Sequence, residues 1–187
     1  MRETDEQLYN SFLQNKNNED LRELLERHRN NLTLFLFGIV HDMEDAEELM
    51  LDSFAVLVSG SPGFLGKSSF KTWLFSVGRN LALKHLRKKR PMVPLQDAGE
   101  GNQLSINEVP ESGLIKNETY MQLYAAMERL NPDYREILQL IYFEEMSLDE
   151  AAAVMKKTKK QVYNLSTRSR QALKDELERM GFDIDVF

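Results

Sequence analysis

The chain has 187 residues, of which 42% are hydrophobic and 29% are charged, and its formal net charge is −6. This is the composition of a folded protein of one or two domains rather than of a disordered chain. Because cysteine is absent, disulfides and thiolate metal sites are excluded, which is compatible with a reducing compartment. The N-terminus lacks the apolar segment of a signal peptide, and no apolar run reaches the length of about 18 residues that a membrane span needs, so we expect neither.

Apolar residues recur at helical spacing along the first half of the chain, and alternation of period two is almost absent. The spacing predicts one helix over about residues 19–40 and a second over about 43–59. A segment with three glycines and a proline then interrupts the pattern. A third helix is predicted to begin after a capping Ser68 or Ser69 and to end near Lys89.

The helical pattern stops between residues 91 and 115, a stretch with three prolines, three glycines, four acidic residues and no lysine or arginine. We interpret this stretch as an acidic, flexible linker. Helical spacing resumes over 117–130, and a new helix, capped by Asn131 with Pro132 in its first turn, continues to about Glu144. The sequence therefore predicts an all-α fold with a first helical domain, a linker and a second helical domain, over residues 1–90, 91–115 and 116–187.

The C-terminal domain holds the pattern of a helix-turn-helix. Residues 147–155 predict a short amphipathic helix, about three residues form a turn, and residues 159–178 predict a longer helix. Seven basic residues and no acidic one fall between Lys156 and Lys174. In this arrangement the second helix enters a DNA major groove, although a solvated basic helix on a bundle is the alternative. The side chains opposite its apolar face suit phosphate and base contacts, and the candidates are Lys160, Tyr163, Asn164, Thr167 and Arg168.

A second basic cluster, residues 84–90, ends the third predicted helix with five cations in seven residues, and Arg79 and Asn80 lie upstream of it. Cations at a helix C-terminus are favoured by the helix dipole, so capping is one interpretation. Five cations exceed what capping needs, and contact with a nucleic-acid backbone is the other interpretation.

An acidic cluster on the second predicted helix surrounds Leu51, which points away from the apolar stripe of that helix. An exposed leucine among carboxylates is more typical of a protein-docking patch than of a solvated face. The residues of this predicted patch are Glu47, Glu48, Leu51 and Asp52.

No pattern in the sequence points to catalysis. The three histidines are scattered and lack neighbouring nucleophiles, the acidic cluster lacks metal-ligand spacing, and no glycine-rich loop suits a phosphate. We therefore expect no catalytic residue, no metal and no cofactor, and we expect the protein not to be an enzyme.

Three segments, in order, resemble the extracytoplasmic-function sigma factors of bacteria. Residues 45–54, DAEELMLDSF, are similar to the family's helix that docks on the clamp helices of RNA polymerase. Residues 68–90, SSFKTWLFSVGRNLALKHLRKKR, resemble the family's segment that captures and opens the downstream (−10) promoter element. Residues 130–138, LNPDYREIL, begin a segment that continues through the helix-turn-helix and is similar to the domain that reads the upstream (−35) element.

The resemblance implies a cytoplasmic sigma factor with core RNA polymerase and promoter DNA as partners, an anti-sigma factor as a further partner that the family allows, and no membrane contact of its own. Carried over by position, the predicted docking patch faces the polymerase and the five helix-turn-helix candidates face the upstream element. The resemblance also implies that the downstream element is bound by the loop over residues 63–69 and by Asn80, Lys84, Arg87, Lys88 and Arg90.

Two positions of the helix-turn-helix depart from the family, which usually has glycine where Lys156 stands and arginine where Leu165 stands.

We expect the two DNA-binding modules to be oriented only once both sit on the polymerase, because about 25 flexible residues separate them. The alternative hypothesis is a dimeric helix-turn-helix regulator that binds operator DNA through a separate N-terminal dimerisation domain, without being a polymerase subunit.

Overall fold

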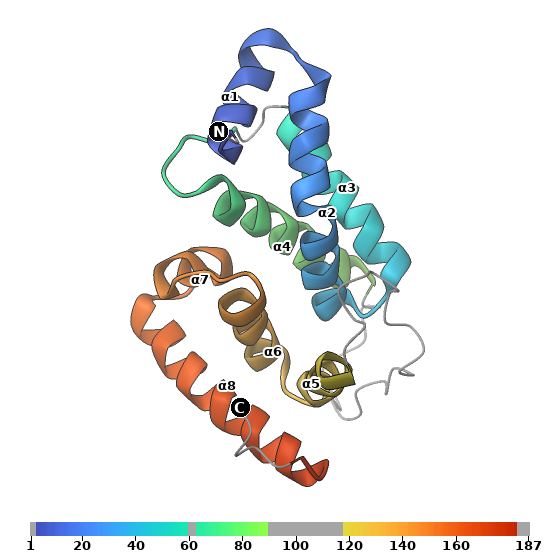
Figure 1. Cartoon of the computed structure of the whole chain (residues 1–187), viewed down its shortest axis with the longest axis vertical. Helices are drawn as coiled ribbons and strands as arrows, with labels where there is room; N and C mark the ends of the chain where they lie inside the picture. Colours follow the sequence, from blue (N-terminus) through green and yellow to red (C-terminus); the bar gives the residue numbers. More distant parts are fainter. Residues whose placement is uncertain (1–2, 60–62, 90–117, 183–187) are drawn as a thin grey trace.

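The computed structural model describes residues 3–59, 63–89 and 118–182, and every regular element in these ranges is helical (Figure 1). The prediction of an all-α fold is therefore confirmed. The predicted linker and Arg90 lie outside the described residues. The first half contains α1 (Asp5–Asn15), α2 (Asn18–Val40), α3 (Met43–Ser59) and α4 (Phe70–Lys89). The second half contains α5 (Glu118–Glu128), α6 (Pro132–Leu138), the π-helix η2 (Gln139–Phe143), α7 (Leu148–Met155) and α8 (Lys159–Arg179).

Helix α1 is an element that we did not predict. Thr4 and Gln7 form a capping box, in which the Gln7 backbone N–H donates to the Thr4 hydroxyl (3.3 Å) and the Thr4 N–H donates to the Gln7 side-chain oxygen (2.8 Å). Its buried face consists of Leu8, Tyr9 and Phe12. The spacing of these three residues is helical, and Thr4 with Gln7 is a capping-box signal, so the sequence does carry signals for this helix, although the segment has only 11 residues.

A charged contact joins α1 to α2. The Asp5 carboxylate accepts hydrogen bonds from His28 Nε2 (2.6 Å) and from an Arg27 guanidinium nitrogen (2.8 Å). The His28 hydrogen bond is the main cause that lowers the pKa of Asp5 to about 2; burial opposes this shift and Arg27 adds to it. A carboxyl group with a lowered pKa stabilises the fold at every pH above its ordinary value, because the folded state holds it ionised.

Replacing Asp5 with asparagine is expected to lower the free energy of unfolding at pH 7 by about 1–2 kcal/mol. The stabilisation is complete above the ordinary pKa of 3.8 and is lost as the pH falls toward about 2. Urea unfolding at several pH values checks this, with the exposed Glu26→Gln as a matched control. Equal stabilities of the wild type and the Asp5→Asn variant at pH 7 would contradict the assignment.

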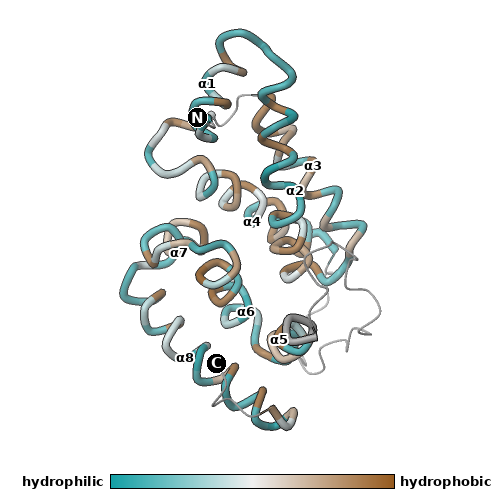
Figure 2. The backbone as a smooth tube through the Cα atoms, in the orientation of Figure 1, coloured by the Kyte–Doolittle hydropathy of each residue, from teal (hydrophilic) through white to brown (hydrophobic). Residues whose placement is uncertain are grey.

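The two halves pack directly on one another, which corrects our expectation of separately placed modules. Helix α4 lies against α7, and α2 lies against α6 (Figure 1). The buried side chains of both halves form one continuous cluster, in which Phe75 of α4 and Val154 of α7 are fully buried. Figure 2 shows bands of apolar residues alternating with polar ones along α2, α4 and α8, as expected for helices that bury one side. This shared core sets the positions of the charged surfaces described next.

Candidate nucleic-acid interface

The helix-turn-helix consists of α7, a three-residue turn and α8. Ser147 and Thr158 begin the two helices, each with a reciprocal capping box. At the turn, Lys156 adopts the left-handed conformation (φ 54°), and its backbone N–H donates to the carbonyls at the end of α7. Glycine adopts this conformation without strain, which gives a physical reason for the glycine that the family usually has at this position. The turn is formed here despite the departure from the family pattern.

Helix α8 presents its polar face to solvent. Its inner face is formed by Val162, Ser166 and Ser169, all of which are buried. Tyr163 is 59% exposed, so its ring is free to contact another molecule. The structure thus brings all five predicted upstream-element residues together on the outer face of one helix, and each of them is exposed: Lys160, Tyr163, Asn164, Thr167 and Arg168.

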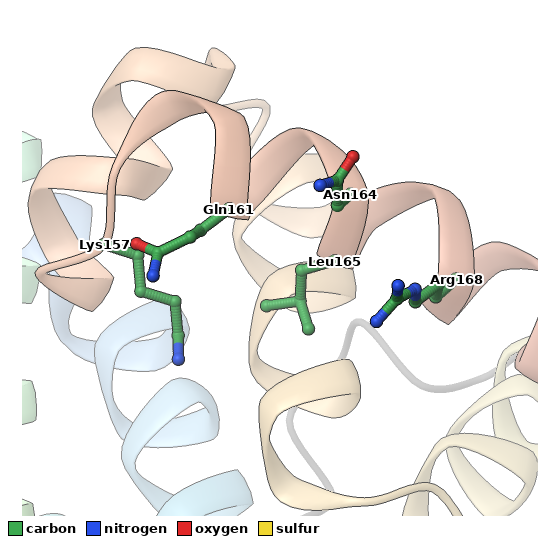
Figure 3. A pocket seen from close by; sticks show the side chains of 5 residues that line it. All are labelled: Lys157, Gln161, Asn164, Leu165 and Arg168. Carbon is green, nitrogen blue, oxygen red and sulfur yellow. The ribbon is translucent and has the colours of Figure 1, made fainter.

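An open pocket of about 210 Å³ lies along α8 (Figure 3). It is smaller than the ~300–1,000 Å³ pockets that hold small molecules, so we interpret it as a hollow in a macromolecular contact surface. In Figure 3, Asn164 points outward from α8, whereas Leu165 points into the space beneath it. The lining residues are Lys157, Gln161, Asn164, Leu165 and Arg168.

Gln161 is absent from the predicted set, although the pocket places it beside Asn164 and Arg168. Its side-chain oxygen accepts hydrogen bonds from the backbone N–H (2.8 Å) and hydroxyl (3.0 Å) of Thr158. The spacing of Thr158 and Gln161 is a capping-box signal, so the sequence could have indicated this capping contact. The position of Gln161 on the pocket wall depends on the tertiary structure.

The end of α4 forms a second exposed basic surface. Asn80, Lys84, Arg87 and Lys88 are all exposed. Within the described part of the chain, the three cations of this set form no ion pair, and Arg87 donates only to the Leu83 carbonyl (3.2 Å). These charges are therefore available to an external anion such as a nucleic-acid phosphate.

Lys89 has a different role from its neighbours in the basic cluster. Its ammonium group binds the carboxylate of Asp45 at the start of α3, and His85 Nε2 lies 3.1 Å from the same carboxylate. The hydrogen bond from Lys89 is the main cause that lowers the pKa of Asp45. Asp45 and Lys89 therefore join the start of α3 to the end of α4.

Arg79 lies on a different side of α4 from Asn80. Its guanidinium is buried and forms two hydrogen bonds with the carboxylate of Glu136 on α6, one of them 3.2 Å long. Burial raises the pKa of Glu136, and the hydrogen bond from Arg79 opposes that shift. In this conformation Arg79 contacts the second half of the chain rather than solvent.

The predicted docking patch lies on the outer side of α3. Leu51 is 57% exposed, whereas Leu49, Met50 and Phe54 of the same helix are buried. The surrounding carboxylates of the patch are exposed too, namely Glu47, Glu48 and Asp52. An apolar side chain within a negative rim is a surface suited to a protein partner with a complementary charge.

Two further findings concern the described residues only. No group of three or more histidine, cysteine, aspartate or glutamate side chains in these ranges is placed to hold a metal ion. No helix among them is long and apolar enough to cross a bilayer.

Comparison with protein families finds two matches, in the order expected from the resemblance. Residues 24–91 match the family described as "Sigma-70 region 2", and residues 120–173 match "Sigma-70, region 4". Among curated relatives, the "ECF RNA polymerase sigma factor SigM" of Bacillus subtilis (strain 168) is 30% identical over 152 residues, which cover 81% of this chain and 91% of the relative. The "ECF RNA polymerase sigma factor SigX" of the same strain is 24% identical over 164 residues, which cover 86% of this chain and 84% of the relative.

Two solved structures share the fold. One is the sigma factor RpoE in complex with the anti-sigma factor NepR from Bartonella quintana, with a TM-score of 0.64, 22% identity and coverage of 86% of this chain and 98% of that one. The other is CnrH in complex with the cytosolic domain of CnrY, with a TM-score of 0.62 and 21% identity. The match covers 94% of this chain and 95% of that one.

The hypothesis of a dimeric regulator requires a dimerisation domain in the N-terminal half. That half instead matches Sigma-70 region 2, and the helix-turn-helix matches Sigma-70 region 4. The two matches, together with the identity and coverage of the relatives, show that this chain belongs to the extracytoplasmic-function RNA polymerase sigma factors.

Proposed function

We propose that the protein is an alternative sigma factor, which binds core RNA polymerase and directs it to a specific set of promoters. The observation that carries this proposal is the presence of Sigma-70 regions 2 and 4 in one chain, each with an exposed charged surface. As a transcription initiation factor it supplies binding and promoter recognition, and the polymerase supplies the chemistry. We place its action in the cytoplasm, where bacterial transcription takes place.

We assign one role to each of three exposed surfaces, which are the docking patch on α3, the basic end of α4 and the outer face of α8. Region 2, which we assign to residues 1–90, docks on the polymerase through Glu47, Glu48, Leu51 and Asp52. It also binds and opens the downstream promoter element through Asn80, Lys84, Arg87, Lys88 and Arg90. Region 4, which we assign to residues 116–187, reads the upstream element through Lys160, Tyr163, Asn164, Thr167 and Arg168. The intervening residues 91–115 act as the linker between the two regions.

We include an anti-sigma factor among the proposed partners. The solved RpoE structure holds an anti-sigma factor, and the present chain shares its fold. An exposed apolar and acidic patch on region 2 and a basic helix on region 4 offer such a partner two surfaces of opposite charge. A pull-down from the native host that returns only polymerase subunits argues against this partner.

In-vitro transcription on sheared genomic DNA tests the main proposal. Core polymerase with the purified protein is expected to start transcripts at discrete sites that core polymerase alone does not use. The common sequences upstream of those starts then define the two promoter elements. A dimeric protein that shifts palindromic DNA by itself and adds no start sites would overturn the proposal.

A further inference from the structure

Helix α1 lies outside the stretch that matches Sigma-70 region 2, which begins at residue 24. It nevertheless lies beside the start of α4 (Figure 1). The loop over residues 63–69, which we assign to the downstream element, leads directly into this start. Helix α1 is thus next to a segment that we assign to DNA, although it contributes no residue to the three surfaces described above.

The loop is exposed in its middle and anchored at its two ends. Residues 65–68 are all exposed, and Leu65 reaches 78%. Gly66 adopts the left-handed backbone conformation (φ 69°), which glycine does without strain. At one end Phe64 is half-buried, and just after the other end Phe70 is fully buried. The position of the exposed tip therefore depends on what holds these two phenylalanines.

One ring of α1 packs against both ends of the loop. Tyr9 is 1% exposed, and its ring centroid lies 5.8 Å from that of Phe64 and 5.5 Å from that of Phe70. The rings of Tyr9 and Phe64 meet edge to face, an arrangement that the quadrupoles of aromatic rings favour. Trp73, one turn into α4, completes the cluster at 6.2 Å from Tyr9 and 5.9 Å from Phe64. Loss of the Tyr9 ring would remove the support that both ends of the loop share.

Glu6, one turn before Tyr9, adds a directional contact. Its carboxylate oxygen Oε1 accepts a hydrogen bond from the backbone N–H of Phe70 (2.9 Å). This N–H belongs to the first turn of α4, where backbone donors have no partner within the helix. The negative charge is also favoured by the helix dipole at that end. Glu6 therefore fixes the point at which the loop becomes a helix.

Helix α1 is itself joined to the body of region 2. Asp5 accepts the hydrogen bonds from His28 and Arg27 of α2 described above. Because α1, the loop and α4 all belong to the same region, these contacts do not depend on where region 4 lies. Helix α1 thus connects α2 to a loop whose tip is exposed.

We propose that α1 is a positioning element for promoter reading, in which Tyr9 and Glu6 hold the loop over residues 63–69 in the conformation that binds the downstream element. This inference rests on the proposed function. Neither residue touches the DNA; both act through Phe64 and Phe70. A loop held in its binding conformation loses less conformational entropy on binding, and it fits one arrangement of bases better than others. The support from α1 therefore increases selectivity at the downstream element, whereas α8 reads the upstream element independently.

The mobility of the loop in the free protein provides the first test. Because the chain has no cysteine, Lys67→Cys introduces a single site for a spin label at an exposed loop position, and Ala55→Cys does the same on α3. Tyr9→Leu is expected to increase the mobility of the loop label and to leave the label on α3 unchanged. Tyr9→Phe retains the ring and should give the wild-type spectrum. An unrestrained loop label in the otherwise wild-type chain, or a wild-type spectrum in Tyr9→Leu, would overturn the proposal.

Phe12→Leu is the matched control, because it makes the same kind of change on the same buried face, one turn further along α1. Phe12 is 4% exposed, and its ring contacts the ammonium group of Lys16 at 5.5 Å. Glu6→Ala is a second, independent variant at a half-buried position, so α1 is expected to remain folded. Glu6→Gln retains an acceptor oxygen for the Phe70 N–H and should behave as the wild type. Circular dichroism melting shows whether each variant is folded.

Transcription from a promoter library with core polymerase provides the second test. Tyr9→Leu is expected to reduce discrimination between bases by at least ~5-fold at one or two downstream positions, out of the ~5–150-fold that a specific contact provides. Glu6→Ala should act in the same direction, and the upstream preference should be unchanged in both variants. Any loss in Phe12→Leu should be the same for all promoters, which is the result that a purely structural role of α1 predicts for Tyr9→Leu as well.

The two possible failures are distinguishable. Wild-type downstream preference in folded Tyr9→Leu and Glu6→Ala would overturn the role of α1, whatever the mobility of the loop label. A wild-type protein that directs no new start sites would instead refute the proposed function itself.

Discussion

Replacing Leu51 with arginine and Glu48 with lysine is expected to abolish binding to core RNA polymerase. Leu51 is 57% exposed at the centre of the docking patch. An apolar side chain that becomes buried on binding, within a charged rim, carries much of the binding energy of an interface. The two changes remove the anchor and reverse one rim charge, with an expected loss of about 2–5 kcal/mol. Co-purification with core enzyme and a titration of binding measure the effect.

The fold is expected to survive these changes, because neither side chain belongs to the buried face of α3. The matched control is Val58→Arg with Glu26→Lys, which makes the same two types of charge change at exposed positions elsewhere on the same half. Circular dichroism should be unchanged in both double variants. If the Leu51 variant co-purifies with core enzyme at the level of the control, the docking assignment is wrong.

Alanine at Arg168 or Asn164 is expected to weaken initiation by about 1–3 kcal/mol and to relax preference at one or two upstream positions. Both side chains are exposed on the outer face of α8, which is long enough to follow a major groove while Val162 anchors its inner face. Arg170→Ala is the control. Arg170 follows Arg168 by two residues and therefore lies on a different side of the helix. This control variant should leave the sequence preference at the upstream positions unchanged, and any loss of initiation should be the same for all promoter sequences.

Asn80→Ala tests the other half of promoter reading. Asn80 lies on α4, so its loss should impair strand opening while it leaves the upstream preference intact. Transcription from a promoter library measures sequence preference, and permanganate footprinting of unpaired thymines measures opening. A changed upstream preference in Asn80→Ala, or an unchanged one in Arg168→Ala, would refute the division of labour between the two regions.

The sequence by itself determined the long helices and the outward faces of the predicted surfaces. The apolar spacing of residues 43–59 predicted α3 and the exposure of Leu51, and the Ser147 cap predicted the start of α7. These features depend on the 3.6-residue period and on hydrogen bonds between residues about three apart, both of which can be read from a short window. The roles of the exposed residues stay predictions until the variants are tested.

The tertiary structure decided the partners of the charged residues. Asp45 belongs to an acidic segment and Arg79 lies shortly before a basic one, yet Arg79 contacts Glu136 and Asp45 contacts Lys89. Helix α1 also depends on long-range contacts, because Tyr9 packs against Phe70, with 5.5 Å between ring centroids. Such contacts join residues many positions apart, and their formation depends on how whole helices pack. For that reason the sequence indicated which residues are charged and exposed, and only the packed chain showed which of them bind each other.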